Sequence, residues 1–127
     1  MKKLLSLLFL MMIFSSISYA EWKVVSFSAD GDAFYVDFSK IKKSKGYVYY
    51  WHLLDRVKPT KYGDLSTKRL NELDCNTPRR QRSLSGNYFT QPMGEGTPSV
   101  TDNTTREWVF PPPNSSVDLV INAVCSY

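Results

Sequence analysis

Residues 115–127 read SSVDLVINAVCSY, and this stretch predicts an amphipathic helix near the C-terminus. Ser115 or Ser116 can cap its first turn, and Asp118 suits the positive end of the helix dipole. Apolar side chains then recur at helical spacing, at positions 117, 120, 121, 124 and 125. Because a helix of about ten residues is marginal by itself in water, its apolar stripe must pack against another layer.

Cys125 lies on that stripe, and Cys75 is the only other cysteine. In an exported protein, which folds in an oxidising compartment, two cysteines are best interpreted as a disulfide. Closing a loop of about 50 residues would stabilise the fold by roughly 4 kcal/mol in the chain-entropy model. The alternative is a pair of free or redox-active thiols, but neither a C-x-x-C motif nor an adjacent histidine supports it.

Export is predicted by residues 1–20, MKKLLSLLFLMMIFSSISYA, which have the features of a secretory signal peptide. The apolar run from Leu4 to Phe14 is shorter than the ~20 residues that a membrane-spanning helix needs. A lipoprotein would need a cysteine after the cleavage point, where the sequence has Glu21. We therefore expect a periplasmic or secreted protein that has neither a lipid anchor nor a membrane span after cleavage.

Cleavage would leave residues 21–127, which are 107 residues and fit one domain. Two of the 16 basic residues, Lys2 and Lys3, lie in the signal peptide, so 14 basic residues face 12 acidic ones and the net charge is +2. That excess is too small to indicate a nucleic-acid partner.

Five segments are rich in the β-branched and aromatic residues that favour strands, namely 22–28, 33–37, 47–56, 65–75 and 79–90. Asp30-Gly31 between the first two predicts a tight hairpin. A calcium-binding loop is a more specific functional interpretation of Asp30, Asp32 and Asp37 than a simple turn. The glutamate and the ligand spacing of an EF-hand are missing, however. We expect no metal site there.

The remaining segments are predicted as connections. Residues 38–46 form a basic loop, and 91–108 form a long irregular loop with its tip at Gly94–Gly96. A short edge strand is expected at 108–110, before three prolines. Residues 65–75 could also be a helix, since Leu65, Leu70 and Leu73 lie near helical spacing. The prediction is an α+β fold: a single antiparallel sheet of about six strands, with one C-terminal helix packed on one face and tethered by a disulfide.

The strand at 47–56 carries apolar or aromatic residues on both faces, which is typical of a central strand covered on two sides. Tyr47, Tyr49 and Trp51 share one face of it. A single helix cannot cover both faces of a sheet, and an apolar patch left open marks a contact surface.

Catalytic patterns are sparse. His52 is the only histidine and has no nucleophile partner evident in the sequence, so a structural role is expected rather than catalysis or metal binding. We predict no enzyme activity and no cofactor. Two basic clusters could engage a polyanionic surface, although solvated charge is the simpler interpretation; they comprise Lys40, Lys42, Lys43 and Lys45, and Arg79, Arg80 and Arg82.

An ordered set of residues resembles the bacterial surface-adhesin protein E family. The set is Trp22, Tyr35-Val36-Asp37, Leu54-Asp55-Arg56, Cys75 with Arg79 and Arg80, Pro92 to Gly96, Trp108, the prolines and Val124-Cys125. The resemblance covers residues 21–127 and implies one domain with an antiparallel sheet and a helix held by a disulfide. It also implies adhesion to host matrix or serum proteins, and association with dimers. The missing lipoprotein cysteine is a departure from the adhesin that names the family.

The sequence therefore predicts an exported, non-enzymatic interaction protein that binds a protein partner or a second copy of itself. The candidate binding residues are Tyr47, Tyr49, Trp51, Lys42, Lys43, Arg79, Arg80 and Arg82. The alternative function is a soluble periplasmic carrier, with a small apolar ligand between sheet and helix.

Overall fold

A computed structural model describes residues 20–127, so the predicted signal peptide lies outside the described residues except for Ala20. The elements follow the order β1 (Trp22–Phe27), β2 (Ala33–Asp37), η2 (Phe38–Lys40), β3 (Lys42–Ser44), β4 (Tyr47–Asp55), β5 (Ser66–Asp74), β6 (Arg80–Phe89), η3 (Pro92–Gly94), β7 (Val100–Asp102) and α2 (Ser116–Cys125). Within these residues no helix has the length and the apolar composition to span a membrane.

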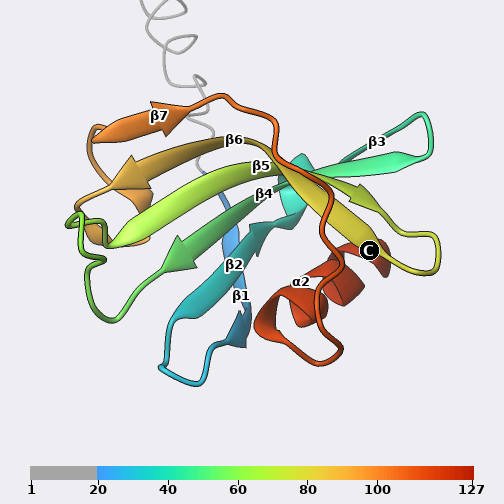
Figure 1. Cartoon of the computed structure of the whole chain (residues 1–127), viewed down its shortest axis with the longest axis horizontal. Helices are drawn as coiled ribbons and strands as arrows, with labels where there is room; N and C mark the ends of the chain where they lie inside the picture. Colours follow the sequence, from blue (N-terminus) through green and yellow to red (C-terminus); the bar gives the residue numbers. More distant parts are fainter. Residues whose placement is uncertain (1–19) are drawn as a thin grey trace, which may run out of the picture.

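The strands form one antiparallel sheet in the order β1-β2-β4-β5-β6-β7, and β3 pairs with β4 beside this path (Figure 1). The predicted α+β architecture is confirmed. Residues 66–74 are a strand and not the alternative helix, because residues 66–73 pair with β4 and the whole segment pairs with β6.

The predicted hairpin between β1 and β2 is also confirmed. Gly31 has φ 91° and donates its N–H to the Ser28 carbonyl. Asp32 accepts a hydrogen bond from the Val57 N–H, which is a structural use of this carboxylate. Residues 20–127 contain no group of three or more side chains that could hold a metal ion.

Three predictions about short strands are wrong. The basic loop contains strand β3, because Lys45 and Gly46 both take positive φ and close a two-residue turn into β4. The edge strand lies at Val100–Asp102, inside the segment expected to be irregular. Residues 108–110 form only one isolated bridge, between Val109 and Gln81.

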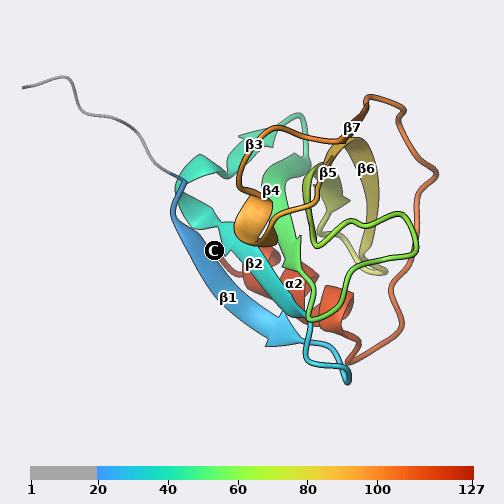
Figure 2. The same cartoon turned by 90° about the vertical axis from the view of Figure 1, so that its left-hand side faces the viewer.

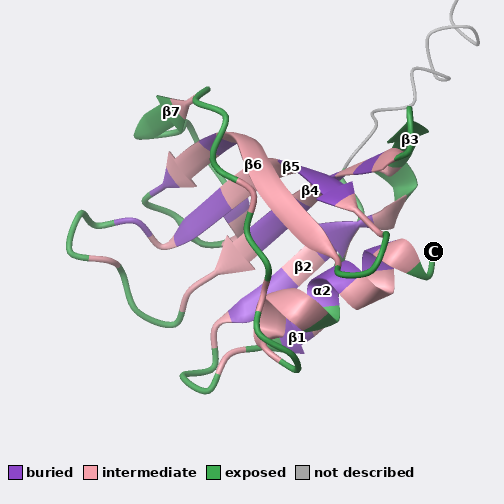
Figure 3. Ribbon diagram, turned by 45° about the vertical axis from the view of Figure 1, so that its right-hand side comes forward, coloured by how far each residue is buried: buried purple, intermediate pink, exposed green. Residues whose placement is uncertain are grey.

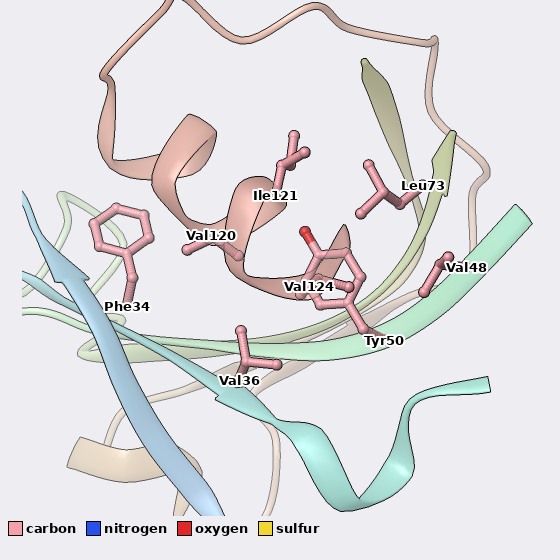
Figure 4. Packing of buried hydrophobic residues seen from close by; sticks show 8 residues of the cluster. All are labelled: Phe34, Val36, Val48, Tyr50, Leu73, Val120, Ile121 and Val124. Carbon is pink, nitrogen blue, oxygen red and sulfur yellow. The ribbon is translucent and has the colours of Figure 1, made fainter. Parts of the chain in front are cut away.

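Helix α2 covers one face of the sheet. Ser115 caps it by accepting a hydrogen bond from the Asp118 N–H at 3.2 Å. Figure 4 shows its apolar side chains directed toward the sheet, where the buried core forms. The core consists of Phe34, Val36, Val48, Tyr50, Leu73, Val120, Ile121 and Val124. In Figure 3, buried residues concentrate on the strands and the helix surface facing them, while the β3 hairpin and β7 are exposed.

The predicted disulfide between Cys75 and Cys125 is present, with Cα atoms 5.7 Å apart. It joins the residue after β5 to the last residue of α2. The backbone of the helix lies closest to β1 and β2, and the bond ties its last turn to the end of β5, on the far side of β4.

The loop at η3 packs on the opposite face of the sheet, as Figure 2 shows. Gly94 is buried and donates its N–H to the Ser66 hydroxyl at 2.8 Å. Leu53 of β4 is fully buried on this side, where η3 contacts β4 and β5. The prediction that Gly94–Gly96 forms a loop tip is therefore wrong for Gly94, which is part of a second covering element.

Candidate functional site

The part of the sheet that neither α2 nor η3 covers carries a row of aromatic side chains. Tyr47, Tyr49 and Trp51 of β4 are half-buried there, while the alternate residues Val48 and Tyr50 face the core. Strand geometry causes this separation, because successive side chains point to opposite faces. Together with Trp108, described next, these residues are called the aromatic face.

Trp108 joins the aromatic face from the segment after β7. Its ring centroid lies 5.7 Å from that of Tyr47. The guanidinium groups of Arg80 and Arg82 lie over the indole ring, at 4.3 and 4.6 Å from its centroid. Such stacking is favourable because the ring face carries negative charge density. Trp108 was not among the predicted binding residues; the signal in the sequence was a single tryptophan among polar and charged residues.

Arg80 and Arg82 are also paired with carboxylates from β5. Arg80 lies 3.3 Å from Asp74, and Arg82 lies 2.8 Å from Glu72. Glu72 in turn accepts a hydrogen bond from the Tyr49 hydroxyl at 2.7 Å, which raises the pKa of Tyr49 above its ordinary value. Strands β4, β5 and β6 thus contribute to one connected network, whose cations are balanced by their neighbours.

The Asp74 carboxylate shows the same local balance. A hydrogen bond from the Asn76 N–H lowers its pKa most, and the hydrogen bond from Arg80 lowers it further. The pair therefore stays charged through neutral pH. A polyanion would have to compete with Asp74 and Glu72 for these arginines.

The other two predicted binding residues lie elsewhere. Arg79 donates to the Asn122 side-chain oxygen at 2.6 Å and to the Cys75 carbonyl, so it fastens α2. Lys43 donates to the main-chain oxygen of Tyr127 at 3.2 Å. The structure therefore brings together Tyr47, Tyr49, Trp51, Lys42, Arg80 and Arg82, and separates Arg79 and Lys43 from them.

Two adjoining hollows run along the aromatic face. One, of about 490 Å³, is lined by Lys42, Tyr49, Trp51 and Leu70, with residues 39–41. The other, of about 240 Å³, shares Trp51 and Lys40 with the first and extends to Trp22. A concave surface with aromatic walls and a lysine at its rim suits a partner that inserts side chains between the strands and η2.

His52 does not belong to this face. It lies on the α2 side of the sheet and stacks against Phe34, with ring centroids 5.5 Å apart. Burial, followed by the nearby charge of Arg69, lowers its pKa to about 4, so the imidazole is neutral at pH 7.

The family model of surface-adhesin protein E matches residues 22–126, which include the whole sheet and α2. No curated protein matches the chain.

Proposed function

The chain belongs to the surface-adhesin protein E family, and on that premise we propose that it is an exported, non-enzymatic protein that holds a protein partner against the aromatic face. The family description names a surface adhesin, and the partner class that the resemblance implies is a host matrix or serum protein. Export also agrees with the disulfide, because such bonds persist in oxidising compartments.

One observation carries this proposal: Tyr47, Trp51 and Trp108 are half-buried on a hollowed face together with two stacked arginines. Tryptophan, tyrosine and arginine are the residue types that dominate the binding energy of protein interfaces. Pairing and stacking fix the arginines before binding, so less side-chain freedom is lost when a partner docks.

The charge at the rim favours a partner with an acidic surface. Lys40 and Lys42 line the hollow and are exposed, Lys45 is exposed in the turn between β3 and β4, and no salt bridge neutralises any of the three within residues 20–127. Rim charges of this kind steer association and are screened by salt. These lysines, and not Arg80 or Arg82, would make the contact with a polyanionic surface.

The test compares binding of the exported protein and its Trp51→Ala variant to immobilised laminin, fibronectin, collagen and serum glycoproteins by biolayer interferometry. Loss of a central aromatic anchor is expected to weaken binding by about tenfold or more. Lys42→Ala should mainly slow association and reduce the dependence on salt.

Tyr62→Ala is the matched control, since Tyr62 is 78% exposed in the turn between β4 and β5, outside the aromatic face. It should bind like the wild type. Equal binding by Trp51→Ala and the wild type would refute the proposal. A concentration-dependent dimer that Trp51→Ala dissociates would show that the face holds a second copy of the chain instead.

A further inference from the structure

Another hollow lies on the α2 side of the sheet, separate from the two on the aromatic face. It measures about 350 Å³ and lies between β4, β5, the segment at 106–109 and the start of α2. Phe34, Leu54 and Val117 line it with apolar surface, and His52 and Arg69 line it with nitrogen donors. These five residues define the His52 cleft. Because Trp51 and His52 are consecutive strand residues, the cleft and the aromatic face lie on opposite sides of β4.

His52 has a buried nitrogen without a partner. His52 is only 9% exposed, and its Nε2 atom has no hydrogen-bond partner within residues 20–127. Buried polar atoms in folded proteins are nearly always paired, so an orphaned one calls for a specific explanation. The imidazole is neutral at pH 7, so it has one N–H donor and one acceptor nitrogen, and the residue lines the cleft beside Arg69.

Arg69 lies directly across from His52 in the pairing of β4 with β5. It is half-buried, its guanidinium lies over the Tyr88 ring at 5.4 Å, and one N–H donates to the Tyr88 hydroxyl at 2.9 Å. Unlike Arg80, Arg82 and Arg106, it has no carboxylate within 4.0 Å among residues 20–127. A guanidinium presents five N–H groups in a planar fork that fits a carboxylate.

The other charged side chains of the cleft do not bind the guanidinium group of Arg69. Arg106 is paired with Asp102. Glu107 is exposed and is not in an ion pair with Arg69. Arg82 is paired with Glu72 on the aromatic face. The unbalanced cation next to the apolar surface is therefore Arg69.

We propose that the His52 cleft binds a small organic carboxylate with an apolar body. The carboxylate lies between Arg69 and the His52 ring, and the apolar body lies over Phe34, Leu54 and Val117. The volume is at the lower end of the ~300–1,000 Å³ typical of ligand pockets, which limits the ligand to a short aliphatic or single-ring acid.

The test is an NMR titration of the wild-type exported protein with hexanoate and benzoate, and with hexanamide and benzamide as neutral counterparts. Hexanoate or benzoate should shift the His52 ring signals and the Val117 methyl signals and leave the Trp51 indole signal unchanged. Removing the charge of the ligand should weaken binding by about tenfold or more, since charge-assisted pairs are the stronger hydrogen bonds.

Arg69→Met should abolish the preference for the acid over the amide, and His52→Leu should weaken binding of the acid. Arg79→Met is the matched control, because Arg79 also lies on the α2 side but is engaged by Asn122. It should keep the preference. Thermal unfolding identifies any variant that does not fold. The titration of the wild-type protein tests the proposal even if a variant fails to fold.

Absence of shifts with the acids at millimolar concentration would overturn the proposal. Equal binding of acids and amides, unchanged in Arg69→Met, would also overturn it. Neither result would affect the proposed protein binding, which is measured through Trp51 on the other side of the sheet.

Discussion

At the scale of single residues, His52 makes the stability of the fold depend on pH. It is the only histidine of the chain, and burial lowers its pKa from 6.5 to about 4 in the folded protein. The unfolded chain therefore takes up a proton at a pH where the folded protein does not. Protons then favour unfolding, and stability is lost as the pH falls from 6.5 toward 4.

The predicted effect is a loss of about 2 kcal/mol in the free energy of unfolding between about pH 7 and about pH 5, from the two pKa values of His52. Urea unfolding at both pH values measures it. Asp74 and Asp102 do not contribute in this range, because their folded pKa values are lowered from 3.8 and their contributions are lost only at lower pH.

His52→Leu is the control for this pH dependence. The variant removes the titrating group and the orphaned nitrogen, so its stability should be nearly constant over the same range. If the wild type and the variant lose stability equally between the two pH values, the loss has another source and the prediction fails.

At the scale of elements, η3 provides the second cover of the sheet. Gly94 has φ 63°, a conformation that costs a residue with a Cβ atom roughly 1–2 kcal/mol. A Cβ at this position would also approach Cδ and Cγ of Lys68 to 3.1 and 3.2 Å. Lys68 would have to leave the ring of Phe89, over which its ammonium group lies at 5.2 Å.

Gly94→Ala should therefore destabilise the protein by about 2 kcal/mol, combining the backbone strain with the displacement of Lys68. Gly96→Ala is the matched control, since Gly96 also has positive φ but its nearest atom would be Gln91 Cγ at 3.8 Å. Gly96→Ala should lower the free energy of unfolding only by the backbone strain of positive φ. Urea unfolding of both variants distinguishes them, and a Gly96→Ala cost equal to or above that of Gly94→Ala would contradict the role of Lys68.

The long elements could be predicted from local sequence, and the short ones could not. β4 and α2 carry their own periodicity, and Asp30-Gly31 specifies its own hairpin. β7 has three residues and exists only because β6 pairs with it, so its sequence holds no adequate local signal.

The candidate site divides in the same way. Alternation in β4 placed Tyr47, Tyr49 and Trp51 on one face correctly. The sequence cluster around Arg79 was misleading, because strand geometry sends neighbours to opposite sides: Arg80 meets Trp108, whereas Arg79 meets α2. Trp108 reaches Tyr47 only through the path of the chain beside β6, which is a tertiary property.

At the scale of the whole molecule, α2 connects distant parts of the sheet. Two hydrogen bonds join β1 to the start of the helix: Ser26 Oγ donates to the Ser116 carbonyl, and Ser116 Oγ donates to the Phe27 carbonyl. At the other end, the disulfide and Arg79 hold the helix to the turn between β5 and β6. The helix thus joins the first edge of the sheet to its middle.

Replacing both cysteines, in Cys75→Ser/Cys125→Ser, should lower the free energy of unfolding by about 4 kcal/mol, because the bond closes a loop of 50 residues in the unfolded chain. Urea unfolding measures the total, and hydrogen exchange locates the change. The last turn of α2 should lose most protection, because there the helix depends on the bond and on Arg79. The first turn should lose less, since Ser115 and the β1 contacts remain.

Arg79→Met with the disulfide intact is the control and should show a smaller loss of protection at the last turn of α2. Unchanged protection of Val124 in the double variant would show that core packing alone holds the helix, and that the disulfide does not position it.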